Sequence, residues 1–257
     1  MTSRRTWRYV TLDATGTLLR PAEAPGVTYL RFWESASGQT LSSSRRAAAS
    51  DALSRHFPLE FARQSRRNPN FGANDSDATA FAWWRELLLN VMKRADVADC
   101  LAHHQEQGER FTRQVYAHFA RPEAWTVFAD ARPTLERLHA LDVPMGVISN
   151  FDERLEPLLE DLELRAFFDV VTTSFAEPQM KPHASIFLST FRQLQREDAD
   201  VDVSRFLHVG DHPVKDYRAA KTLGAQAKLL WRSNKKSPSD VRENDLIATL
   251  QQVVKDI

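Results

Sequence analysis

The sequence predicts an α/β fold: a parallel β-sheet that is interrupted, after its first strand, by a block of helices. Three observations lead to this prediction. A short apolar segment that ends at Asp13 has the pattern of a buried strand. The region from Pro21 to Pro122 has a helical pattern, and from about Trp125 onward short apolar strands alternate with amphipathic helices. Because strands that alternate with helices form parallel sheets through right-handed crossovers, the first strand belongs with the later ones.

The first strand brings a carboxylate to the edge of the sheet. Residues 7–12 form an apolar run rich in β-formers, Asp13 follows directly, and Gly16 lies three residues further on. Gly16 lets the chain turn sharply. Since open α/β sheets place their chemistry at the carboxyl ends of their strands, Asp13 is a candidate nucleophile.

The inserted block is predicted to be helical from the spacing of its apolar residues. Pro25 suits a helix start. A polar, turn-rich stretch over 66–77 is predicted to be a loop. The predicted helices lie at 27–33, 41–56, 80–92 and, as one or two helices, within 97–119.

The second half of the chain supplies the other strands. Strands are predicted at 144–149, 168–174, 206–210 and 227–231. Helices are predicted at 130–141, 155–164, 186–195, 217–223 and 245–254. Asp130 is expected to cap the start of the first of these helices. A helix separates each of these strands from the next, as a parallel sheet requires.

Composition and charge exclude several classes of protein. Apolar residues make up 42%, enough for a substantial core, and 257 residues suit either one large domain or a core with a smaller insertion. Lys plus Arg equals Asp plus Glu at 34 each, so no overall field favours nucleic acid or an anionic membrane. No apolar run approaches the roughly 18 residues of a membrane-spanning helix, and the single cysteine, Cys100, suits a reducing compartment. We therefore expect a cytoplasmic protein with no nucleic-acid or membrane partner.

Polar residues follow four of the predicted strands. These positions are Asp13, the pair Ser149 and Asn150, Lys181, and Asp211 with Asp216. Taken singly, each has an ordinary interpretation as a turn, a helix cap or a surface lysine. A parallel sheet brings the carboxyl ends of its strands to one edge, so we expect these side chains to converge.

The order and spacing of these residues resemble the haloacid dehalogenase superfamily over nearly the whole chain. The four motifs of that superfamily correspond to Asp13–Leu18, Ser149, Lys181 and Gly210–Asp216. The resemblance implies a Rossmann-like α/β core with an inserted helical-bundle cap of the C1 type. The implied boundaries are 1–20 with 123–257 for the core and 21–122 for the cap. Residues 70–72, 83–85 and 147–152 further resemble one subgroup, the haloacid dehalogenase-like hydrolase domain-containing 3 proteins.

The resemblance implies a phosphatase that acts on a small phosphorylated metabolite with the help of Mg²⁺. Asp13 would attack phosphorus and form an aspartyl-phosphate, which divides hydrolysis into two steps. Mg²⁺ prefers hard oxygen ligands. By resemblance these ligands are the Asp13 carboxylate, the backbone carbonyl of Thr15, Asp211, and Asp216 either directly or through water.

The same resemblance implies a binding site for the phosphoryl group. Thr17 and Ser149 would hydrogen-bond phosphate oxygens, together with backbone N–H groups near the turn. Lys181 would neutralise Asp13 and the phosphate and keep the neighbouring carboxylates ionised. Asn150 would either contact the phosphate or cap the following helix.

Thr15 is a departure from the pattern of the superfamily. Many of its phosphatases carry a second aspartate at this position, which protonates the leaving oxygen and then activates water, an effect typically worth ~10²–10⁴-fold. Threonine has no accessible proton-transfer pKa, although its backbone carbonyl can still bind Mg²⁺. We therefore expect slow turnover, or a preference for good leaving groups such as acyl or aryl phosphates.

Two other functions stay open at this stage. One is a phosphate-binding protein with little catalysis, which would act as a sensor or as a partner subunit. The other is a 2-haloacid dehalogenase, in which Asp13 would displace halide from carbon without a metal. Asp211 after Gly210 disfavours dehalogenation, because a metal-free site has no use for an acidic ligand there.

Overall fold

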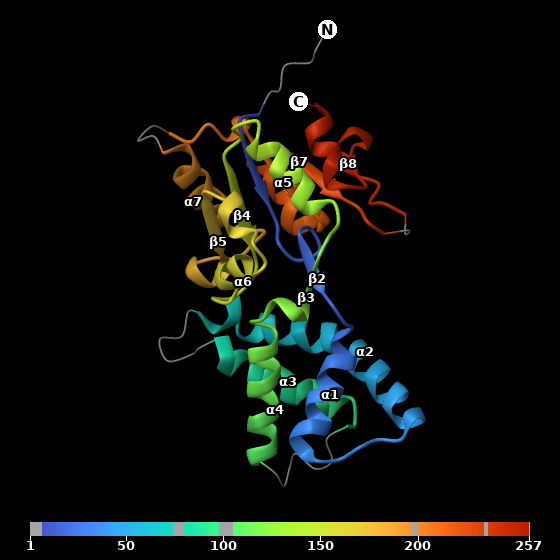
Figure 1. Ribbon diagram of the computed structural model, residues 1–257. Coiled ribbons are helices and arrows are strands. Elements are labelled where there is room, and N and C mark those ends of the chain that lie inside the picture. The colour runs from blue at the N-terminus through green and yellow to red at the C-terminus, as the bar shows by residue number, and fades with distance from the viewer. Residues whose placement is uncertain (1–6, 74–79, 98–104, 197–199, 234–235, 257) are drawn as a thin grey trace. The chain divides into compact units, whose positions relative to one another are not determined.

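The computed structural model of the protein describes residues 7–73, 80–97, 105–196, 200–233 and 236–256. The chain forms two compact units, Met1–Arg20 with Val127–Ile257 and Pro21–Thr126. Figure 1 shows the course of the chain through both. The first is called the α/β unit and the second the helical unit. The role of the helical unit as a cap stays a prediction, and Cys100 lies outside the described residues.

A six-stranded sheet forms the centre of the α/β unit, in the order β5-β4-β1-β6-β7-β8. Its strands are β1 (Tyr9–Leu12), β4 (Met145–Ser149), β5 (Val170–Thr173), β6 (Phe206–Gly210), β7 (Gln226–Leu230) and β8 (Leu246–Ile247). Every neighbouring pair is parallel. This confirms the predicted parallel sheet and places the first strand at its centre, between two strands from the second half of the chain.

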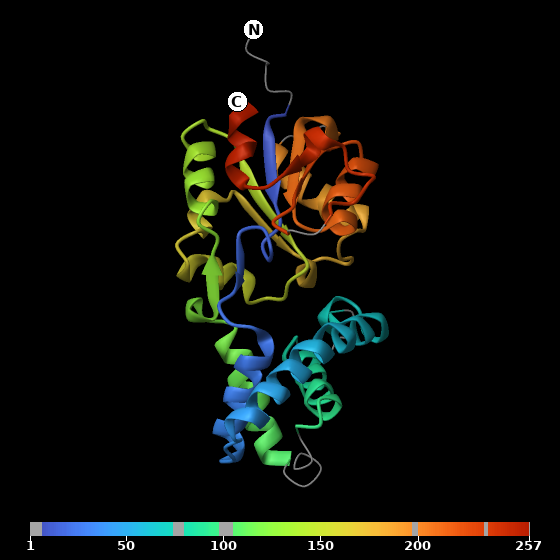
Figure 2. The same cartoon turned by 90° about the vertical axis from the view of Figure 1, so that its right-hand side faces the viewer.

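Helices cover this sheet (Figure 2). The α-helices are α5 (Ala131–His139), α6 (Leu155–Asp161), α7 (Ala184–Gln195) and α8 (Ala219–Thr222). Shorter helical turns are η3 (Arg165–Phe167), η4 (Ser174–Ala176), η5 (Val203–Arg205), the π-helical η6 (Pro213–Arg218), η7 (Glu243–Asp245) and η8 (Leu250–Asp256). In the core, Phe206 of β6 stacks on Phe191 of α7 at 4.0 Å and on Tyr9 of β1 at 4.6 Å. Aromatic packing therefore ties the central strands to the helix beside them.

Two predictions for this unit are wrong. Asp130 precedes α5 but makes no side-chain cap to it; its carboxylate instead binds Arg232, Thr249 and the backbone of Leu250. The predicted C-terminal helix over 245–254 is instead the short strand β8 followed by η8. Leu250 and Val253 are buried three residues apart, a spacing that a 3₁₀-helix satisfies as well as an α-helix does.

The described residues of the helical unit form the α-helices α1 (Pro25–Ser37), α2 (Ser43–Arg67), α3 (Ala80–Arg94) and α4 (Gln105–His118). Two 3₁₀ turns, η1 (Asn70–Gly72) and η2 (Pro122–Ala124), complete it. Helix α1 packs against α2 and α4, and α3 packs against the same two helices. Where the chain passes between the units, β2 (Leu19–Pro21) and β3 (Trp125–Val127) form a separate two-stranded sheet. No helix in the described ranges is long and apolar enough to span a membrane.

The second helix of this unit is longer than predicted. It continues past Pro58 to Arg67, so part of the predicted loop over 66–77 is helical. Proline inside a helix removes one hydrogen bond and crowds the preceding turn. Phe61, one turn beyond the proline, packs edge-on against Trp83 of α3 at 5.3 Å. Packing of this kind outweighs the local cost of the proline.

Candidate active site

Three carboxylates meet at one edge of the sheet. Asp13 follows β1 and Asp211 follows β6, and these strands are neighbours with Leu12 opposite Val209. Asp216 comes from the π-helical turn that follows β6. One oxygen from each of the three carboxylates lies within 4.8 Å of the others. The three carboxylates that were predicted to converge therefore lie together in the structure.

Two glycines make this close approach possible. Gly16 has a φ of +87°, and a Cβ there would lie 2.3 Å from Oδ2 of Asp211. A Cβ on Gly210 would lie 2.2 Å from Cγ of Asp216. Any other residue at either position would displace a carboxylate, so both glycines belong to the site.

Lys181 supplies the positive charge at the centre of this cluster. Its Nζ donates to Oδ1 of Asp13 at 2.8 Å and to Oδ1 of Asp216 at 2.6 Å, and its side chain is 2% exposed. The side chain of Asn150 holds the backbone of Lys181 on both sides. Its Oδ1 accepts from the Lys181 N–H at 2.8 Å, and its Nδ2 donates to the Lys181 carbonyl at 2.9 Å. In the structure, therefore, Asn150 positions Lys181, and its contact with phosphate stays a prediction.

Burial and mutual repulsion shift the pKa values of the carboxylates in different directions. Burial raises the pKa of Asp13, the Asp216 carboxylate adds to this, and Lys181 opposes it. Burial and repulsion from Asp13 and Asp216 raise the pKa of Asp211 to about 7. The pKa of Asp216 lies well below its usual range because Lys181 and a hydrogen bond from His208 outweigh its burial. The pKa of Lys181 is raised, since its two carboxylate partners outweigh its burial.

These residues fit a divalent cation. With His208 neutral, three carboxylates face one ammonium group, so ionisation of all three leaves an excess of negative charge that the cluster does not itself neutralise. The raised pKa of Asp211 is the expected consequence of this imbalance. Carboxylate oxygens are the hard ligands that Mg²⁺ prefers. The donor set therefore suits Mg²⁺, although the identity of the cation stays a proposal.

The residues predicted to bind phosphate lie next to the carboxylates in the chain or in the sheet. Thr17 is fully buried, and within the described part of the chain its hydroxyl has no hydrogen-bond partner. A buried hydroxyl without a partner is rare, and a bound ligand would satisfy it. Ser149 is buried at the end of β4, which pairs with β1, so Ser149 and Asp13 leave the sheet at adjacent strand ends. Thr15 is exposed.

One buried residue at this site was not identified from the sequence. His208 lies within β6, with Nε2 3.2 Å from Oδ1 of Asp216 and Nδ1 2.9 Å from Oγ1 of Thr11. Burial lowers the pKa of His208 more than Asp216 raises it, which favours the neutral ring. The available signal was a histidine inside an apolar strand, two residues before the Gly210–Asp211 motif.

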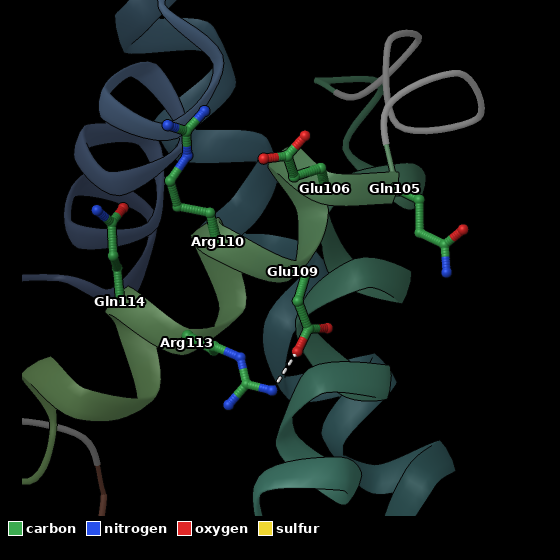
Figure 3. A pocket seen from close by; sticks show the side chains of 6 residues that line it. All are labelled: Gln105, Glu106, Glu109, Arg110, Arg113 and Gln114. Carbon is green, nitrogen blue, oxygen red and sulfur yellow. Dashed lines mark ion pairs between the residues drawn. The ribbon is translucent and has the colours of Figure 1, made fainter.

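A hollow of about 700 Å³ lies over α4 of the helical unit. It is lined by Gln105, Glu106, Glu109, Arg110, Arg113 and Gln114 (Figure 3). Arg113 donates to Glu109 of the same helix at 2.7 Å. The hollow contains none of the residues described above, and its lining charges are paired with one another in part, as on an ordinary solvated helix face.

Comparison with known proteins assigns the chain to a family. Residues 7–224 match the model of the haloacid dehalogenase-like hydrolases. The chain is 32% identical over 248 residues to haloacid dehalogenase-like hydrolase domain-containing protein 3 of Danio rerio, covering 96% of this chain and 94% of that protein. It is 32% identical to a phosphoglycolate phosphatase of Pseudomonas syringae pv. syringae over 141 residues, covering 54% of this chain and 48% of that protein.

Among solved structures, a 2-haloacid dehalogenase from Pseudomonas syringae pv. Tomato has a similar fold. Its TM-score is 0.63 at 23% identity, with 97% of each chain covered. At this level of identity the likeness concerns the fold alone. The family model and the Danio rerio relative each extend over most of the sequence, and both name the family that the four motifs resemble. The chain therefore belongs to the haloacid dehalogenase-like hydrolase family.

Proposed function

We propose that this hydrolase is a Mg²⁺-dependent phosphatase that transfers the phosphoryl group of a small metabolite to Asp13 and then to water. One observation carries the proposal: Asp13, at the end of β1, has Lys181 at 2.8 Å and lies within 4.8 Å of two further carboxylates. A nucleophile, a balancing cation and a set of metal ligands are the groups this chemistry needs. The resemblance to a phosphoglycolate phosphatase supports it.

Mg²⁺ would be held by Asp13, Asp211 and the carbonyl of Thr15. When bound, it would neutralise charge on the phosphoryl oxygens and on the carboxylates. Both oxygens of Asp216 already accept hydrogen bonds from protein donors. This favours a role for Asp216 through water over direct coordination.

The protein's own residues would carry out the transfer. Oδ1 of Asp13 accepts the hydrogen bond of Lys181, so we take Oδ2 as the attacking oxygen. A bond forms between Oδ2 and phosphorus while the bond from phosphorus to the leaving oxygen breaks. The hydroxyls of Thr17 and Ser149 would donate to phosphoryl oxygens, which satisfies the buried hydroxyl of Thr17. Water then attacks phosphorus and the bond from phosphorus to Oδ2 of Asp13 breaks. The departing phosphate keeps the protons of the water, which restores the Asp13 carboxylate.

Thr15 limits which substrates can react quickly. Its side chain is exposed and carries no group that can give a proton to the leaving oxygen. A leaving group of low pKa needs no such proton. Acyl and aryl phosphates are therefore the proposed substrate class, and release of phosphate from Asp13 is the proposed slow step.

The test is a panel of phosphorylated substrates, with Mg²⁺ and with chelator, on the wild type and on Asp13→Asn. Phosphate release that needs both Mg²⁺ and Asp13 is the expected result. Asp51→Asn, an exposed carboxylate on α2, is the matched control and keeps the activity. Phosphate analogues that bind without any turnover would favour the binding protein. Halide release from 2-haloacids in the presence of chelator would favour the dehalogenase.

A further inference from the structure

His208 is buried at the point where β6 lies beside β1. The two strands pair in parallel with His208 opposite Thr11, and both side chains are fully buried. The ring of Phe187 meets the imidazole edge-on at 5.1 Å and 83°. The imidazole is thus held by packing, by Thr11 at one nitrogen and by Asp216 at the other.

The partners of the two nitrogens select one tautomer of the ring. A carboxylate can only accept, so Nε2 of His208 carries the hydrogen and donates to Oδ1 of Asp216. In a neutral imidazole the other nitrogen, Nδ1, is then an acceptor. The hydroxyl of Thr11 donates to it at 2.9 Å. Asp216 therefore fixes the direction of these hydrogen bonds, and the hydroxyl of Thr11 adapts to it.

The carboxylate of Asp216 accepts hydrogen bonds from three donors. Oδ1 of Asp216 accepts from Nζ of Lys181 at 2.6 Å and from His208 at 3.2 Å. Oδ2 accepts from the backbone N–H of His212 at 3.0 Å. Lys181 in turn divides its ammonium group between Asp216 and Asp13. The position of Oδ1 of Asp216 therefore helps to determine the position from which the Lys181 ammonium group donates to Asp13.

We propose that His208 is a positioning residue of this site: as the Nε2–H tautomer, with Thr11 donating to its Nδ1, it fixes Asp216 and, through it, Nζ of Lys181 against Asp13. It does not touch the substrate. An apolar ring at this position would fill the same space but leave Asp216 with one donor fewer and Thr11 without its acceptor. The consequence for the rate rests on the proposed function, whereas the tautomer does not.

Amide side chains provide a matched pair of variants. The amide nitrogen of glutamine reaches the place of Nε2 of histidine, whereas that of asparagine reaches only the place of Nδ1. His208→Gln therefore keeps a donor for Asp216, while His208→Asn and His208→Phe do not. We expect His208→Phe and His208→Asn to slow phosphorylation of Asp13 in a single turnover by roughly 10²-fold, because small displacements of a positioned group have effects of this size.

In that experiment KM should stay within about 2-fold of the wild type, since the interaction acts on the transition state and not on substrate binding. His208→Gln should recover most of the rate. His139→Gln, an exposed histidine on α5, serves as the control and should match the wild type. Equal losses in the glutamine and asparagine variants, or an unchanged rate in His208→Phe, would overturn the proposal.

A second measurement does not need activity or a large substitution. In ¹⁵N-histidine NMR spectra of the metal-free protein, His208 should be the Nε2–H tautomer, and it should stay so in Thr11→Val, because Asp216 still accepts from Nε2. An Nδ1–H tautomer in the wild type would contradict the proposal. If the wild type transfers no phosphoryl group at all, the proposed function fails, while the spectra still decide whether His208 is arranged as we infer.

Discussion

Two groups of charged residues in the α/β unit combine carboxylates with a cation in different proportions. In the strand-end cluster (Asp13, Lys181, Asp211 and Asp216), three carboxylates share one ammonium group. In the Asp130–Arg232 cluster, one carboxylate receives two hydrogen bonds from one guanidinium group, at 2.8 and 2.9 Å. The hydroxyl of Thr249 and the backbone N–H of Leu250 also donate hydrogen bonds to Asp130.

The electrostatic consequences of the two arrangements are opposite. Burial raises the pKa of Asp130, but hydrogen bonds from Arg232, Thr249 and Leu250 outweigh burial and lower it overall. In the strand-end cluster the pKa of Asp211 is raised to about 7. A balanced pair stabilises the fold at neutral pH, whereas an excess of carboxylates destabilises it until a cation binds. A raised carboxylate pKa within a group of acids therefore distinguishes a candidate reactive site from a structural ion pair.

Removal of the charge of Lys181 should have the largest effect. Lys181→Met leaves two buried carboxylates without their cation, so we expect activity to fall by roughly 10³-fold and the free energy of unfolding by about 3–5 kcal/mol. Steady-state kinetics and urea unfolding measure the two quantities. Asp130→Asn is the comparison from the balanced cluster, and it should lower stability by about 1–3 kcal/mol while kcat per folded molecule stays within about 3-fold. Similar losses of kcat in both variants would contradict the distinction.

The two clusters should also respond to pH with opposite signs. The folded-state pKa of Asp211 is above its ordinary value of 3.8, so without metal its contribution to stability falls as pH rises from about 4 to about 7. Asp211→Asn should therefore stabilise the metal-free protein above pH 7, by about 1–2 kcal/mol after allowance for partial exposure, and have no such effect near pH 4. Thermal unfolding at both pH values measures this. A destabilised variant at pH 8 without Mg²⁺ would be inconsistent with the repulsion described here.

The sign is reversed for Asp130, whose pKa is lowered below its ordinary value of 3.8. Its contribution is fully present above pH 3.8 and is lost as pH falls through the folded-state value. The difference in unfolding free energy between the wild type and Asp130→Asn should therefore be constant from pH 5 to 8 and shrink in stronger acid. A difference that grows below pH 4 would show that Asp130 is not the ionised partner of Arg232.

The sequence was sufficient to predict the sheet except for its edge strand β8, and to predict the residues at the strand ends. Asp13 and Asp211 stand next to strongly apolar strands, and Gly16 and Gly210 mark close approaches that no larger residue permits. These are local signals. The strand-end convergence then follows from parallel pairing alone.

Features that depend on pairing between distant segments were not predictable in this way. His208 and Thr11 are 197 residues apart, and only the register of β1 against β6 brings them together. Asp130 precedes a helix and has the local pattern of a cap, but its strongest partner, Arg232, comes from beyond β7. In both cases a long-range hydrogen bond decided the role that local sequence left open.

In the proposed function the strand-end cluster would accept a phosphoryl group, but Thr15 supplies no acid to help release it. Thr15→Asp would place a carboxyl group at this exposed position, two residues after Asp13, the proposed nucleophile. If proton transfer limits turnover, kcat for alkyl phosphates should rise by about 10-fold. This gain is smaller than the ~10²–10⁴-fold typical of an evolved acid–base group, because the surroundings of residue 15 are not adapted to a carboxyl group.

The gain should be confined to substrates that need a proton. For aryl and acyl phosphates phosphorylation of Asp13 should be unchanged, and only the later attack of water should become faster, which a burst experiment separates from the first step. Thr15→Asn is the control of matched size without a titratable group, and it should give no gain. An equal rise for alkyl and aryl phosphates in the first step, or a rise in Thr15→Asn, would show that the side chain acts through the shape or charge of the loop and not through proton transfer.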